Sequence, residues 1–403
     1  MWSRRRSPAL LLAAALLPAG LSGCSGSDAP EHATAPPPDV ARAIARALDA
    51  RAHDVRHGDD AAFARLVAGP PAFRAEQRTW FANVTQLPVA TLAYRVHDDT
   101  LVREGDRYTV TADLVLALEG YDDHPVVTPA RFGFRASARH PGRFLLTSAS
   151  TADPQPWDLG PIDVRQGSGV LGVFDAGSVA DAPDLLTSVE SGIASVSAQV
   201  PYDWSRSVVL YALSDPTFLD GLPDVPGDDP EGLDALAFPV GRSTRVALNP
   251  RMLDEAGSER DRLVRHELTH VAVGSRDDAV PVWLSEGIAE WVSVRSLAPQ
   301  DRRIPDAAVA AAEVDVESGT ADLPDDATFN DADSEAHYGL AWWAMESLAD
   351  SYGPQAPWQL LDAMAVPGAD PDVVLRDQLG TSTAQLALQA DRLILSLYDP
   401  GAR

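Results

Sequence analysis

Two histidines four residues apart are the first feature of this sequence that could do chemistry. His266 and His270 enclose Glu267 in the stretch RHELTH. On a helix, residues i and i+4 lie on one face with Cβ atoms about 5–6 Å apart. Imidazole nitrogens at this spacing can share one zinc ion at about 2.0–2.1 Å. Glu267 can face that ion without binding it, which is the position of a general base for a water molecule.

A second acidic motif favours a metal site over an amphipathic helix that merely carries two partly exposed histidines. The stretch PVWLSEGIAEWV places Glu286 sixteen residues after His270, and Glu290 one helical turn later. Glu286 can supply a third metal ligand. Glu290 can accept the second N–H of a ligating histidine, which fixes the tautomer of that ring and raises its basicity. Core packing would explain the tryptophans of this stretch, but not two glutamates on one face.

Several helices and strands are needed to position these residues. Residues 259–274 read as a helix ended by Gly274, and residues 281–292 as a second helix, in which Gly287 permits close approach to a neighbour. Residues 337–353 read as a third helix. Buried strands are predicted at 169–174, 207–212 and 244–248, with a helix between residues 182 and 200.

The residues before position 152 follow a different pattern. Residues 39–66 have apolar residues at helical spacing, and after residue 88 the period changes to two. Strands are predicted at 92–96, 108–112, 114–118, 132–136 and 144–148. Helices followed by antiparallel strands indicate an α+β domain, and the order of elements resembles the NTF2-like fold. We find no catalytic constellation there, and interpret Asp122-Asp123-His124 as a solvated hairpin turn rather than a metal-binding loop.

The N-terminus reads as an export signal. Three arginines precede an apolar run at residues 9–17 that is too short for an ordinary membrane span. Leu21-Ser22-Gly23-Cys24 resembles the lipobox of bacterial lipoproteins, in which the cysteine carries lipid and becomes the mature N-terminus. Cys24 is the only cysteine, so an internal disulfide is excluded. The alternative is an ordinary secretory signal with an incidental cysteine.

The paired motifs resemble those of the peptidase MA-like, or gluzincin, zinc metallopeptidases. HELTH followed by WLSEGIAEW carries the resemblance, which is strongest over residues 246–292 and weaker over 153–398. It implies that His266, His270 and Glu286 bind Zn²⁺, that Glu267 is the catalytic base and that Glu290 supports a ligating histidine. The interval between His270 and Glu286 is shorter than in thermolysin, which puts the connecting loop in doubt but not the ligand set.

The resemblance also implies an activity, the hydrolysis of peptide or protein substrates by an endopeptidase or an aminopeptidase-like enzyme. Glu267 would deprotonate a water molecule that zinc activates. A further donor would stabilise the oxyanion: Tyr338 is the candidate and His337 competes with it. The strand at 244–248 is expected to pair with extended substrate, as edge strands do in relatives. The competing hypothesis is a noncatalytic lipoprotein that binds a ligand or cell-envelope component through its N-terminal domain.

These observations predict an α+β protein of several parts. We expect a signal peptide at 1–24, a flexible tether at 25–38, an NTF2-like domain at 39–152 and a metallopeptidase domain at 153–400, with a small mixed sheet, an active-site helix and a helical C-terminal subdomain. The chain of 403 residues has a formal net charge of -27 and no lysine, which argues against nucleic-acid binding. We expect a monomer, anchored to the bacterial cell membrane through lipidated Cys24 and facing the extracytoplasmic side.

Overall fold

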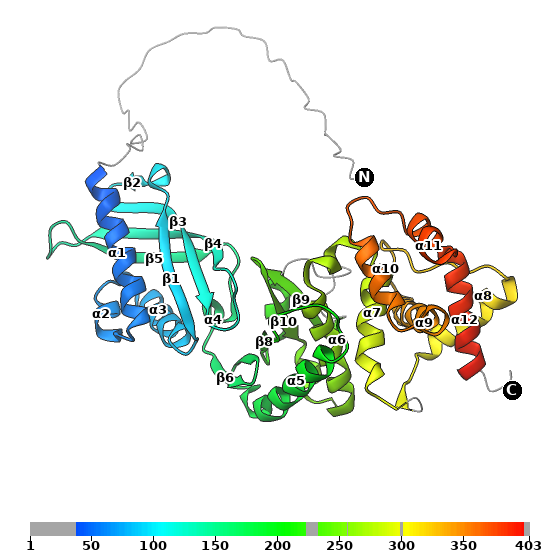
Figure 1. Cartoon of the computed structure of the whole chain (residues 1–403). Helices are drawn as coiled ribbons and strands as arrows, with labels where there is room; N and C mark the ends of the chain where they lie inside the picture. The colour runs from blue at the N-terminus through cyan, green and yellow to red at the C-terminus, as the bar shows by residue number, and fades with distance from the viewer. Residues whose placement is uncertain (1–37, 223–232, 256, 299–300, 399–403) are drawn as a thin grey trace, which may run out of the picture.

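The computed structural model describes residues 38–222, 233–255, 257–298 and 301–398. The predicted signal peptide with Cys24, and the predicted tether up to residue 37, lie outside the described residues. Within the described residues, no helix is both long and apolar enough to cross a membrane. The predicted α+β fold class is confirmed, because helices accompany two separate five-stranded sheets (Figure 1).

The N-terminal half places helices before an antiparallel sheet, in the predicted order. Its elements are α1 (Pro38–Arg56), α2 (Asp60–Ala64), α3 (Pro71–Val84), β1 (Val89–Val96), β2 (Val102–Glu104), β3 (Arg107–Leu118), β4 (Val126–Ala136) and β5 (Phe144–Thr151). The strand order is β1-β3-β4-β5, and β2 pairs with β3. The predicted break between residues 112 and 114 is wrong. Asp113 stays in register within β3, and its carboxylate lies 2.9 Å from His97 Nε2, so the polar residue does not interrupt the strand.

The second half contains a mixed sheet. It consists of β6 (Asp163–Gly167), β7 (Val170–Phe174), β8 (Val208–Ala212), β9 (Ala235–Val240) and β10 (Ser243–Leu248), in the order β6-β7-β8-β10-β9. The three central strands are parallel, and β6 and β9 are antiparallel edge strands. The expectation that residues 244–248 form a substrate-binding edge is therefore wrong, because β10 lies between β8 and β9. The edge belongs to β9, which the sequence analysis missed.

Helices supply most of the remaining structure. They are α4 (Pro156–Leu159), α5 (Ala182–Ser197), α6 (Gly257–Val273), α7 (Val282–Arg295), α8 (Asp306–Ser318), α9 (Ser334–Tyr352), α10 (Ala356–Met364), α11 (Pro371–Leu379) and α12 (Thr383–Tyr398), with a short helix η7 (Gly274–Ala279) between α6 and α7. Gly274 has φ +62°, which agrees with its predicted role at the end of α6. Helices α7 to α12 form the C-terminal end of the molecule (Figure 1).

The central sheet is covered on both faces. Val208, Leu210 and Ala212 of β8 belong to the apolar core that includes α5, α6 and the C-terminal helices. Val209 and Tyr211 belong to the second core, which is shared with the N-terminal half. Because successive side chains of a strand point to opposite faces, the N-terminal half packs on the face of this sheet opposite α5 and α6.

A buried ion pair connects the two halves. Arg245 of β10 donates to the carboxylate of Asp122 in the loop between β3 and β4, and the side chains are 3% and 1% exposed. The interpretation of Asp122-Asp123-His124 as a solvated turn is therefore correct for Asp123 and His124, which are exposed, but wrong for Asp122. The partner of Asp122 lies 123 residues away in sequence, so no local pattern could indicate it.

Candidate metal centre

Two packed helices position the motif residues. Helix α6 carries His266, Glu267 and His270, and it packs against α7, which carries Glu286 and Glu290. Helix α7 in turn packs on α9. A Cβ on Gly287 would lie 2.5 Å from the carbonyl oxygen of Ala341 in α9, so only glycine permits this approach. The close packing predicted from the small residue is observed, and it fixes α7 beside the histidines.

Three possible ligand atoms form a small triangle. His266 Nε2 lies 3.1 Å from Glu286 Oε2 and 3.2 Å from His270 Nε2, and His270 Nε2 lies 3.5 Å from Glu286 Oε2. Ligands placed tetrahedrally at zinc distances of about 2.0–2.1 Å would be about 3.3–3.4 Å apart. The spacing of the three atoms therefore fits one small divalent ion, and the donors are of the type zinc prefers. Within the described residues, this is the one group of His, Cys, Asp or Glu with such spacing.

The other nitrogen of each imidazole faces a carboxylate. His266 Nδ1 lies 3.1 Å from Glu290 Oε1, and His270 Nδ1 lies 2.8 Å from Asp277 Oδ2. Arg262 donates to Glu290 Oε2 at 2.5 Å, and Ser285 Oγ donates to Asp277 Oδ1 at 2.5 Å. A carboxylate that accepts Nδ1–H leaves the lone pair on Nε2, the atom at the triangle. Glu290 and Asp277 thus each lie at ion-pair distance from the Nδ1 of one histidine.

The close charges shift the pKa values of this cluster. Burial opposes the charged imidazolium, but contacts with Glu286 and Glu290 outweigh it and raise the pKa of His266 to about 10. Burial likewise opposes ionisation of Glu290, but His266 and Arg262 lower its pKa to about 2. The pKa of His270 is raised by Asp277 and Glu286 against the same burial cost. The carboxylates around each imidazole therefore favour its charged form.

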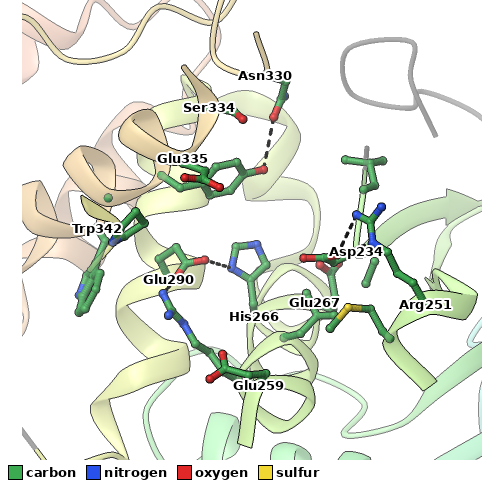
Figure 2. A pocket seen from close by; sticks show the side chains of 18 of the residues that line it. Asp234, Arg251, Glu259, His266, Glu267, Glu290, Asn330, Ser334, Glu335 and Trp342 are labelled. Atoms are coloured by element: carbon green, nitrogen blue, oxygen red, sulfur yellow. Dashed lines mark hydrogen bonds and ion pairs between the residues drawn. The ribbon is translucent and has the colours of Figure 1, made fainter. Parts of the chain in front are cut away.

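Glu267 lines a cavity with a volume of about 670 Å³. His266 and Glu290 line the same cavity (Figure 2). Tyr338 also belongs to its lining. Glu267 is 5% exposed. Burial raises the pKa of its carboxyl, because the charged form loses hydration. Glu267 is not one of the three residues whose possible ligand atoms form the triangle.

Of the two candidate oxyanion donors, Tyr338 lines the cavity and His337 is not among its lining residues. The Tyr338 ring centre lies 6.2 Å from that of His266, and its hydroxyl donates to Asn330 Oδ1 at 3.4 Å. His337 Nδ1 instead lies 2.9 Å from the carbonyl oxygen of Phe329. Burial raises the pKa of Tyr338 well above its usual range, so its hydroxyl keeps a proton to donate.

The cavity is lined mainly by acidic side chains. Its charged lining comprises six carboxylates and two guanidinium groups, contributed by Asp234, Glu259, Glu267, Glu290, Asp331, Glu335, Arg251 and Arg262. Arg251 pairs with Asp234 (Figure 2). Arg262 pairs with Glu290. Glu259 and Glu335 are exposed where they line the cavity. The excess of carboxylates favours a ligand that carries positive charge.

Three contributors to the site escaped the sequence analysis: Asp277, Ser285 and Arg262. Asp277 follows His270 by seven residues, within the short η7 helix that turns the chain back towards α7. An acidic residue in the connection between HELTH and WLSEG is a signal that could have been used. Arg262 is one helical turn before His266, so its position on the same face of α6 was also predictable.

Comparisons with known proteins give no relative from which a role could be transferred. No protein-family model matches the chain, and no curated protein matches it.

Proposed function

We propose that this protein is a gluzincin-like zinc metallopeptidase. The observation that carries the proposal is the triangle of His266 Nε2, His270 Nε2 and Glu286 Oε2, in which each imidazole also faces a carboxylate through its Nδ1. Structural ion-pair networks also bring histidine and glutamate together. A shared metal ion accounts at once for two Nε2 atoms 3.2 Å apart and for a carboxylate oxygen within 3.5 Å of both.

The residues around the triangle would have distinct tasks. Zinc held there would supply a Lewis acid for the attack of water on a carbonyl group. Glu267 would take a proton from the attacking water and pass it to the leaving amine, for which the raised pKa of its carboxyl is suited. Tyr338 would donate its hydroxyl hydrogen to the oxygen that gains charge. Glu290 and Asp277 would hold the imidazole rings.

The substrate class follows from the shape and charge of the cavity. An extended polypeptide can pair with the edge of β9, because Ala235 at the start of this strand lines the same cavity as His266 and Glu267. The carboxylates of Glu259 and Glu335 would attract a basic side chain of the substrate. We therefore propose polypeptides with a basic residue near the cleaved bond, acted on at the extracytoplasmic face of the membrane to which Cys24 would anchor the enzyme.

Metal analysis and hydrolysis together test this function. The purified chain is expected to contain about one zinc ion and to cleave peptides from an unbiased library, with cleavage abolished by a chelator. Glu267→Gln is expected to keep the metal and lose about 10²–10⁴-fold in kcat, whereas His266→Ala is expected to lose the metal. Glu313→Gln changes an exposed glutamate on α8 and serves as the control.

Two results would contradict the proposal. If the Glu267→Gln variant hydrolysed peptides at the full rate, Glu267 could not be the general base. Zinc binding without cleavage of any peptide would instead favour the noncatalytic lipoprotein.

A further inference from the structure

A second groove lies between the two halves of the protein. It has a volume of about 320 Å³. One wall includes Val127 of β4, in the N-terminal half, and Leu159 of α4, in the segment that follows this half. The other wall includes Phe218, Phe238 and Val240 of the second half. Ligand sites occur preferentially at such domain boundaries.

Most residues that line this groove are apolar, and two of them are well exposed. Val127 is 46% exposed and Leu159 is 58% exposed, and both belong to the small set of large apolar side chains that are exposed in the described part of the chain. Asp153 is the one charged residue among those described that line the groove. The groove thus contrasts with the acidic cavity at the triangle. An uncharged, apolar ligand fits it.

Strand β9 connects the groove to the metal centre. Ala235 lines the cavity of His266 and Glu267, while Phe238, Pro239, Val240 and Gly241 line the groove. The interval of three to six residues spans about 10–20 Å of extended chain. A peptide that pairs with β9 beside Glu267 would therefore reach the groove within the same extended segment.

The backbone of β9 can accept such a peptide. Gly241 has φ +65° in the two-residue turn to β10, and Val240 pairs with Ser243 across that turn. In an antiparallel pair closed in this way, the backbone groups of Ala237 and Pro239 point away from β10. The N–H of Ala237 donates to the Glu267 carboxylate, so this edge offers a peptide the carbonyl oxygens of Ala237 and Pro239. Pro239 has no N–H but can accept through its carbonyl oxygen. The turn itself lies against β4, since a Cβ on Gly241 would be 3.5 Å from Val126 Cγ2.

We propose that the groove binds an apolar, extended segment of the polypeptide substrate, several residues away from the bond beside Glu267. The N-terminal half is then part of the substrate-binding surface. The buried pair of Arg245 and Asp122 fixes the two walls relative to each other. That the bound peptide is a substrate rests on the proposed peptidase function. That the groove binds an apolar peptide does not depend on this function.

Peptide binding to the full chain carrying Glu267→Gln tests this inference. The probes are two fluorescent peptides with a central arginine, measured by anisotropy. The short one has about six residues, and the long one has about sixteen, with leucine and phenylalanine towards both ends. Val127→Asp and Leu159→Asp are each expected to lower the affinity for the long peptide by at least about 10-fold, which is the effect of one buried apolar side chain. The affinity for the short peptide is expected to stay unchanged.

Val373→Asp is the matched control, because Val373 is 47% exposed and lies on α11, away from the groove. The inference is overturned if the long peptide binds no tighter than the short one, or if the groove variants behave like Val373→Asp. A chain that binds the long peptide through the groove yet cleaves no peptide would disprove the peptidase function and leave the groove inference standing. A chain that cleaves peptides, but binds the long peptide equally well after Val127→Asp, would support the peptidase function and disprove the groove inference.

Discussion

At the scale of single residues, the arrangement is defined by which nitrogen of each histidine meets which carboxylate. His266 and His270 direct Nε2 towards each other and Glu286, and direct Nδ1 towards Glu290 and Asp277. Without a metal ion between them, the two Nε2 atoms, 3.2 Å apart, would need a proton between them. The carboxylates on the Nδ1 side determine that orientation.

The contribution of Asp277 can be measured directly. Asp277→Asn removes the charge that holds His270 Nδ1, and zinc affinity is expected to fall about 10–100-fold. Competition with a chromophoric chelator measures the affinity. Asp350→Asn, an exposed aspartate on α9, is the control. Equal zinc affinity in the two variants would show that Asp277 has no role in the site.

At the scale of elements, the distance between α7 and α9 controls where Glu286 lies. The carbonyl oxygen of Ala341 occupies the space that any side chain at position 287 would need. Helix α9 also carries Tyr338, so the same contact sets both a proposed ligand and a proposed donor.

Gly287→Ala tests this dependence. The added methyl group must push α7 and α9 apart, and overpacking of this kind typically costs about 1–3 kcal/mol. We expect a lower Tm, together with weaker zinc binding than in the wild type. Gly257→Ala is the control, because a Cβ there meets nothing within 4 Å. If both variants match the wild type, the helices are not held at this spacing by Gly287.

A buried acidic residue on α12 is expected to make the stability of the fold depend on pH. Asp391 is 1% exposed, and burial, together with Asp315 of α8, raises its pKa from 3.8 to about 7. Between these values the folded chain keeps a proton that the unfolded chain releases, so this residue lowers stability as the pH rises from about 4 to 7. Above pH 7 the whole cost is present.

Asp391→Asn removes this cost. The variant is expected to melt at a higher temperature than the wild type at pH 8, with the difference shrinking towards pH 4. Thermal unfolding across this range measures the effect. Asp377→Asn, an exposed change on α11, should show no such trend. A difference in Tm that is constant with pH would contradict the assignment.

At the scale of the whole molecule, the central sheet is buried between helices on one face and the N-terminal half on the other. The two halves therefore share an apolar core on one face of the central sheet. Because of this arrangement, the N-terminal half, which has no catalytic constellation, borders the groove that we propose for substrate.

The ion pair between the halves is expected to stabilise that arrangement. Asp122→Asn leaves Arg245 buried without a charged partner, which typically costs about 3–5 kcal/mol. Denaturant unfolding measures the loss. Asp123→Asn changes the exposed neighbouring residue and is expected to have almost no effect. Equal stability of the two variants would exclude a structural role for the pair.

The sequence by itself determined the local parts of this protein. The spacing of His266, Glu267 and His270 fixes their relation on one helix, because helical geometry repeats within four residues. The same periodicity predicted Glu286 and Glu290 on one face, the strands β7 and β8, and the α+β class. These features depend only on near neighbours in the chain.

Tertiary structure alone decided the rest. Strand β9 is not predictable from the sequence, because Pro239 interrupts its strand pattern and only its pairing with β10 defines it. The burial of Asp122 is not predictable either, because its partner Arg245 is distant in sequence. The sequence left Tyr338 and His337 as alternatives, and of the two only Tyr338 lines the cavity. Each of these outcomes depends on long-range packing, which brings together side chains that no local pattern relates.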